Sequence, residues 1–97
     1  MASEDSAPEL ILGPHAGHFL SQAEPDERRE VYLRLFSLLL DPKPDGVQKI
    51  DLNHFPYDPA LNIRQLKDDL FLIIYRVQLN GDIWILNIFR LQDLPGL

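Results

Sequence analysis

The segment that decides the fold is residues 70–89, which read LFLIIYRVQLNGDIWILNIF. Two runs rich in β-branched and aromatic residues flank the dipeptide Asn80-Gly81, and such runs are typical of β-strands. Asn-Gly is a strong hairpin signal, because a two-residue type I′ turn needs positive φ at both central positions. We therefore predict a β-hairpin whose strands cover 70–79 and 83–89.

A two-residue loop would fix the register of this hairpin and hence the two faces of its sheet. The first face would carry Ile73, Tyr75, Val77 and Leu79, with Ile88, Leu86, Trp84 and Asp82 opposite. This face is largely apolar, and we expect it to form the core beneath the helices.

The second face of the predicted hairpin mixes polar and apolar side chains. Its members are Leu72, Ile74, Arg76, Ile83, Ile85, Asn87 and Phe89. An exposed apolar patch on a sheet usually marks a partner-binding site. Two interpretations stay open: either a loop or the C-terminal tail of the chain covers this face, or a protein partner binds there.

Upstream of the hairpin, the pattern predicts one short strand and then two helices. Residues 9–12 form an apolar run that ends at a Gly-Pro pair, and residues 15–22 follow as a short helix. A second helix starts near Pro25, where acidic residues suit the positive end of the helix dipole, and runs to about Leu40. Its core positions, spaced three or four apart, are Val31, Leu35 and Leu38.

The middle of the chain connects the second helix to the hairpin. Residues 41–46 contain two prolines and a glycine, which end the helix. We expect an extended segment at 47–52, a loop at 53–59, a strand at 61–66 and a turn at 67–69. The predicted order is therefore strand, helix, helix and a meander of antiparallel strands.

The chain has 97 residues, which is enough for a single domain. We assign residues 9–92 to one α+β domain with both helices on one face of a small, mainly antiparallel sheet. Residues 1–8 are expected to be a flexible acidic N-terminus, and residues 93–97 a tail.

Composition limits the function. There is no cysteine, so a disulfide framework or a thiolate metal site is excluded, and a cytoplasmic location fits. No apolar run approaches the ~20 residues of a membrane helix. The net charge of -6 disfavours direct binding of nucleic acid, which depends on lysine and arginine.

No cofactor or metal site is expected. His15 and His18 are three residues apart on the first helix, but two ligands do not make a closed zinc site. The charged residues of the second helix are expected to be solvated on its exposed side. These residues are Glu24, Asp26, Glu27, Glu30, Arg28, Arg29 and Arg34.

The chain resembles the RelE/ParE superfamily of bacterial toxins over about residues 9–92. The resemblance rests on the order of elements and on DLFLIIYRV at 69–77, the Asn-Gly turn and IWILNI at 83–88. LLLDP at 38–42 is also similar to the helix end that precedes the basic loop of the family. The resemblance implies a RelE/ParE-like fold and a toxin that a protein antitoxin neutralises.

Some members of this family cut messenger RNA on the ribosome, and others bind DNA gyrase. RNA cleavage requires cations that stabilise the phosphate and a group that transfers a proton. The basic candidates in this sequence are Arg76, Arg64, Arg90 and Lys49. Leu72 stands where the family has a strand arginine, and the last strand ends in Phe-Arg-Leu-Gln at 89–92. Most of the catalytic residues are therefore absent.

Two functional hypotheses follow. In the first, the chain is a RelE/ParE-like toxin-type protein that acts through a protein partner, with the ribosome or gyrase as targets and an antitoxin as inhibitor. In the second, the fold serves as a non-toxic protein-interaction module or homodimer. The sequence leaves enzymatic activity open.

Overall fold

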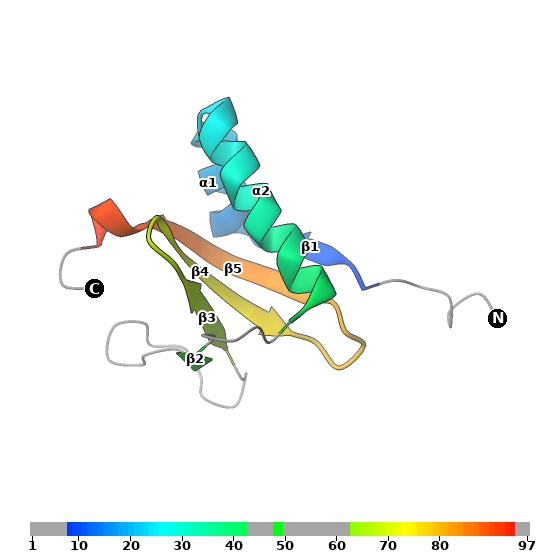
Figure 1. Cartoon of the computed structure of the whole chain (residues 1–97). Coiled ribbons are helices and arrows are strands. Elements are labelled where there is room, and N and C mark those ends of the chain that lie inside the picture. The colour runs from blue at the N-terminus through cyan, green and yellow to red at the C-terminus, as the bar shows by residue number, and fades with distance from the viewer. Residues whose placement is uncertain (1–7, 43–47, 50–62, 95–97) are drawn as a thin grey trace.

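The computed structural model describes residues 8–42, 48–49 and 63–94 (Figure 1). The elements in chain order are β1 (Leu10–Leu12), α1 (Pro14–Gln22), α2 (Pro25–Leu40), β2 (Gln48–Lys49), β3 (Arg64–Lys67), β4 (Phe71–Val77), β5 (Ile83–Arg90) and the short 3-10 helix η3 (Leu91–Asp93). The predicted order of strand, helix, helix and meander is confirmed, and the fold class is α+β. Of the expected terminal segments 1–8 and 93–97, residues 1–7 and 95–97 lie outside the described residues, as do residues 47 and 50–59 of the expected extended segment and loop.

The strands form one mixed sheet in the order β1-β5-β4-β3-β2. Strands β2 to β5 pair antiparallel as a meander, and β1 joins the far edge parallel to β5. Gly13 lies where α1 begins, and its N–H donates to the carbonyl of Ile85 at 2.9 Å. A Cβ on Gly13 would come within 3.1 Å of that carbonyl oxygen, so the close approach of β1 to β5 favours glycine here.

Both helices pack on the same face of the sheet, as Figure 1 shows. Each begins with a proline at its first position, which needs no backbone donor there. Val31, Leu35 and Leu38 of α2 are fully buried, so the predicted core positions of this helix are confirmed. The guanidinium of Arg28 donates to the carbonyls of Leu20 and Ala23, which satisfies acceptors at the end of α1 and fixes the joint between the helices.

The β4–β5 hairpin exists as predicted, but its loop has three residues instead of two. The N–H of Gln78 donates to Asp82 O at 2.8 Å, and that of Gly81 donates to Gln78 O at 2.9 Å. Gly81 has a φ of 95°, as expected for the glycine of a three-residue hairpin loop. The side chain of Asn80 accepts from the N–H of Asp82 and donates to its carboxylate, so Asn80 stabilises the loop locally.

The longer loop shifts the register near the turn by one residue. Tyr75 therefore pairs with Ile85 instead of Leu86, whereas Ile74 pairs with Asn87 as predicted. Leu86 is the additional residue of a β-bulge at this point, and the bulge restores the predicted register toward Arg90.

The shift exchanges the two faces of β5 between the bulge and the turn. Ile83 and Ile85 were predicted to lie on the partner-binding face, which is wrong. Both are fully buried in the core under the helices. Trp84 was predicted to be in that core, but it lies on the opposite face with 37% of its surface exposed. A one-residue slip has this effect because side chains alternate between faces along a strand.

The second face of the sheet is covered in part by its own chain. Leu72 and Ile74 were predicted to bind a partner, but both are buried, so neither is available at the surface. They form a second small core with Ile63, and Leu91 and Leu94 from the C-terminal segment pack against it. Of the predicted partner-binding residues, only Arg76, Asn87 and Phe89 remain partly exposed on this face.

Candidate functional site

The basic residues singled out from the sequence do not converge on one site. Lys49 pairs with Arg64 across β2 and β3, and Arg64 pairs with Tyr75 of β4, so their backbones lie in one row. The next residue, Arg76, points to the opposite face of the sheet, where Trp84 is its cross-strand partner. Arg90 pairs with Phe71, about 13 Å along β4 from Tyr75 at ~3.3 Å per residue.

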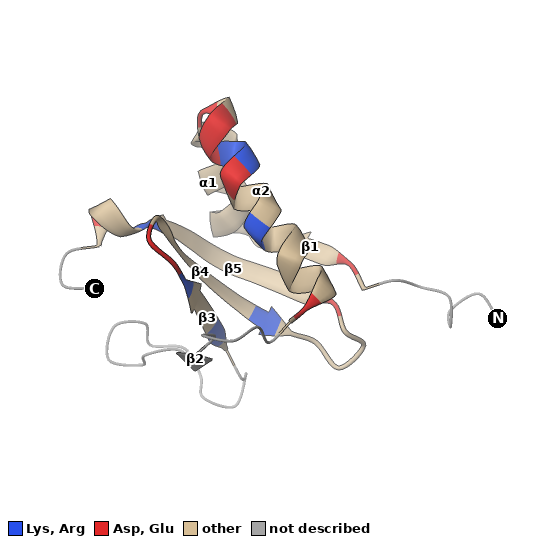
Figure 2. Cartoon of the chain, viewed as in Figure 1, with Lys and Arg blue, Asp and Glu red and all other residues tan. Residues whose placement is uncertain are grey.

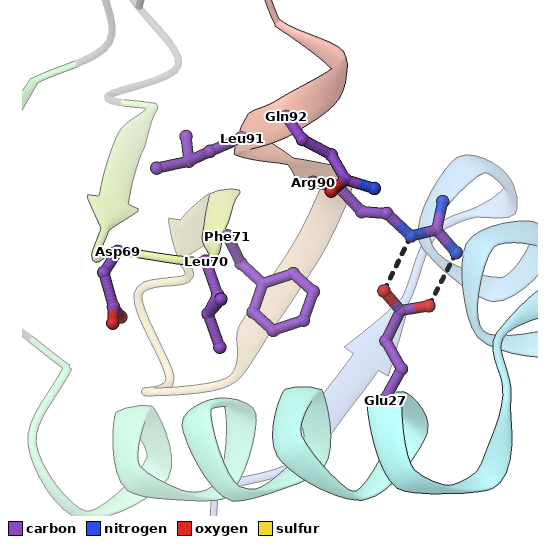
Figure 3. A pocket seen from close by; sticks show the side chains of 7 residues that line it. All are labelled: Glu27, Asp69, Leu70, Phe71, Arg90, Leu91 and Gln92. Carbon is purple, nitrogen blue, oxygen red and sulfur yellow. Dashed lines mark hydrogen bonds and ion pairs between the residues drawn. The ribbon is translucent and has the colours of Figure 1, made fainter.

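Arg90 is engaged in an ion pair that joins the end of β5 to the start of α2. Its guanidinium donates twice to the carboxylate of Glu27, through Nε and Nη2, each at 2.6 Å (Figure 3). This bidentate bond and the positive charge of Arg90 lower the pKa of Glu27 from its ordinary value, although burial opposes the shift. Glu27 was expected to be solvated, and this prediction is wrong because Arg90, at the end of β5, binds its carboxylate.

Two phenylalanines connect Arg90 to a second arginine. The guanidinium carbon of Arg90 lies 4.7 Å from the centre of the Phe19 ring, and that of Arg34 lies 4.9 Å from the centre of the Phe71 ring. The two rings meet edge to face at 6.4 Å. We call these four residues the Arg–Phe ladder. Cation–π and aromatic contacts of this kind hold α1, α2, β4 and β5 together.

Arg34 is held by two carboxylates and was wrongly expected to be exposed. Its guanidinium pairs with Asp68 in the β3–β4 turn and with Glu30 one helical turn earlier, at 3.1 Å. Asp68 also accepts from the N–H groups of Leu70 and Phe71, both at 2.9 Å. Burial raises the pKa of Asp68, but these backbone donors and Arg34 outweigh it and lower the pKa below its ordinary value. Asp68 therefore has two roles: it stabilises the turn and it orients Arg34.

Tyr75 is fully buried beneath α2, and its hydroxyl donates to the carbonyl of Pro42 at 2.8 Å. Burial raises the pKa of Tyr75 to about 12, although the charge of Arg64 opposes the shift. A tyrosine in this position keeps its proton at neutral pH and does not reach a substrate. Its hydroxyl holds Pro42, just after the end of α2, through this bond.

A shallow cleft of about 170 Å³ lies beside the ion pair. Figure 3 shows its lining residues, which are Glu27, Asp69, Leu70, Phe71, Arg90, Leu91 and Gln92. The charges of Glu27 and Arg90 neutralise each other there, and both groups keep their ionised forms at neutral pH. Neither group of the pair is therefore poised for proton transfer, and we assign the ion pair a structural role.

A separate surface lies on the outer side of α2. Leu33, Phe36 and Leu40 expose 59%, 52% and 89% of their surface, and their spacing of three and four places them on one side of the helix. We call these three residues the α2 stripe. Phe36 stacks on Tyr32, with ring centres 5.6 Å apart, so one side of the stripe is aromatic. Figure 2 shows that most charged residues of α2 lie toward its N-terminal end, and the sequence places Asp41 directly after Leu40.

Neither the protein-family models nor the curated proteins that were compared with this chain contain a match. In the described parts of the chain, no helix is long and apolar enough to cross a membrane. Across the same residues, no three histidine, aspartate or glutamate side chains are grouped so that they could hold a metal ion. His15 and His18 are both exposed on α1.

Sequence reasoning missed the ladder and the ion pairs at its ends. Glu27 and Arg90 are 63 residues apart, and Arg34 and Asp68 are 34 apart, so no local pattern connects them. The α2 stripe could have been found from the sequence. Its three residues lie opposite Val31, Leu35 and Leu38 on the helix, and a helix that is apolar on both sides cannot bury both against one sheet.

Proposed function

We propose that this protein acts by binding another protein and not by catalysis, as a RelE/ParE-like toxin-type protein that an antitoxin neutralises. The proposal rests on one observation: the arginine and tyrosine side chains that could take part in RNA cleavage are already engaged within the protein. Arg90 is bound bidentately by Glu27, and Tyr75 is buried with its hydroxyl donated to Pro42. Neither is available to a phosphate.

The positions of the remaining cations support the same proposal. Arg76 and Arg64 project from opposite faces of the sheet, so they cannot clamp one phosphate together. The net charge of -6 also opposes the approach of RNA. Binding to gyrase or to another protein target needs no catalytic set and is compatible with both features.

The test is inducible expression in a bacterial host, with growth and bulk translation followed in parallel. We expect growth to stop while translation continues, and the arrest to be relieved by co-expression of the product of the neighbouring gene. Harmless expression at a high level would contradict a toxin-type function. Arrest with a fall in translation, abolished by Arg76→Ala but not by the matched control Arg29→Ala, would contradict the non-catalytic part of the proposal.

The second candidate is a non-toxic protein-interaction module with the same fold. The exposed α2 stripe favours it, because three adjacent large apolar side chains on one helix are typical of a binding surface. Expression without growth arrest, together with specific capture of a partner that Phe36→Asp abolishes, would support this candidate over the first.

A further inference from the structure

The α2 stripe is the largest group of exposed apolar side chains that one described element presents. We propose that it is the interface of a homodimer, in which the α2 helices of two copies pack antiparallel about a two-fold axis near Phe36. The interface does not depend on the toxin-type function, because none of the three stripe residues lines the cleft beside Glu27 and Arg90.

The first argument is that the stripe is complementary to itself. A two-fold interface requires that when residue i of one copy contacts residue j of the other, j also contacts i. In an antiparallel pair centred between positions 36 and 37, Leu33 faces Leu40 of the second copy, and Phe36 lies next to the axis. Each exposed leucine then has a leucine opposite it, and the two aromatic rings meet at the centre.

The second argument is the distribution of charge along α2. Asp26, Arg29 and Glu30 are exposed in the N-terminal half of the helix, whereas residues 35–40 carry no charge (Figure 2). A parallel pair would bring the acidic ends of two copies together and align their helix dipoles unfavourably. An antiparallel pair brings the uncharged turns together and leaves the charged ends at opposite edges, in contact with water.

The third argument concerns strength. The exposed fractions of the three stripe residues together amount to about two whole side chains in each copy. This is the core of an interface and is smaller than the roughly 800 Å² that each partner buries in a standard stable complex. We therefore expect a reversible dimer with a dissociation constant above about 10 μM.

The experiment is sedimentation equilibrium of the full chain from about 10 μM to about 1 mM. The wild-type protein should pass from monomer to dimer across this range. Phe36→Asp should weaken the dimer at least ~10-fold, because it places two carboxylates side by side at the axis. The matched control is Leu79→Asp, which puts the same charge on the fully exposed leucine of the β4–β5 loop and should change nothing. Circular dichroism confirms that each variant is folded.

The orientation is tested with charge pairs. Leu33→Glu and Leu40→Arg should each weaken the dimer alone. An equal mixture of the two should form a heterodimer, because the carboxylate introduced at position 33 of one copy then faces the guanidinium introduced at position 40 of the other. A mixture of Leu33→Glu with Leu33→Arg should not recover, because position 33 faces itself only in a parallel pair.

Two results would overturn parts of the proposal. Recovery of the dimer in the mixture of Leu33→Glu with Leu33→Arg would overturn the antiparallel arrangement. A wild-type monomer at about 1 mM, or a dimer insensitive to Phe36→Asp, would overturn the interface and leave the stripe to a different protein.

Discussion

Replacing Glu27 with glutamine tests whether the Arg90 ion pair is structural. The change keeps the size of the side chain but removes its charge and one of its two acceptors, so at most one bond to a neutral oxygen replaces the two charge-assisted hydrogen bonds of 2.6 Å. Such bonds contribute roughly 1.5–3 kcal/mol where they are sheltered. The two side chains remain 23% and 32% exposed, and screening by water reduces the expected loss to about 1–2 kcal/mol. For a domain of this size, that lowers Tm by about 4–16 °C.

The pH dependence of stability follows from the same pair. The pKa of Glu27 is lower in the folded protein than its ordinary value of 4.5, so the pair contributes fully above that pH. The contribution is lost as the pH falls through the lowered pKa and Glu27 takes up a proton. Thermal melts of the wild type should therefore lose stability below about pH 4.5 more steeply than melts of Glu27→Gln.

Asp26→Asn is the matched control for this test. It makes the same acid-to-amide change in the same helical turn, where Asp26 pairs with Arg29 but both side chains are largely exposed. The control should lose no more than about 0.5–1 kcal/mol, which includes the dipole contribution. Equal losses in the two variants would refute the structural role of the pair. A gain of RNA cleavage in Glu27→Gln would also refute it, because the change would then have released a catalytic arginine.

Three further predictions concern the hairpin and the core. Ile85→Ala should lower the free energy of unfolding by about 2–5 kcal/mol, and Leu79→Ala by less than about 0.5 kcal/mol, in urea denaturation; equal losses would contradict the observed register. Gly81→Ala should cost about 1–2 kcal/mol because of its φ of 95°, and Gly81→Asn should cost less, since asparagine tolerates this conformation. In an ultraviolet absorbance titration, one tyrosine should ionise near pH 12, and Tyr75→Phe should remove that step and cost about 1 kcal/mol.

The order of elements and the inner face of α2 could be predicted because local signals determine them. Prolines mark the starts of both helices, and the spacing of Val31, Leu35 and Leu38 identifies the core side of α2. The hairpin was predicted from Asn-Gly, but its loop length was not. Asn80 bonds to Asp82 and Gly81 takes the positive φ, and these preferences also suit a three-residue loop.

The faces of β5 and the contacts of its last residue could not be predicted from the sequence. The three-residue loop exchanges the faces of β5 as far as the bulge at Leu86, and no sequence pattern in this apolar run marks the position of the bulge. Ile83, Trp84 and Ile85 are all strand formers, so composition alone does not tell which of them points inward. The engagement of Arg90 by Glu27 depends on how α2 crosses the sheet, which only the assembled fold determines.

The parallel pairing of β1 with β5 has a consequence for synthesis on the ribosome. Leu10 of β1 pairs with Ile83 of β5, and the N–H of Glu9 donates to the side chain of Asp82 across 73 residues of sequence, so β1 cannot pair until β5 has been made. At ~5–20 residues per second this delay is about 4–15 s. During that time the apolar sides of α1 and α2 have no sheet to cover. Chaperone binding to nascent chains should therefore be strongest before β5 emerges and should fall once it does.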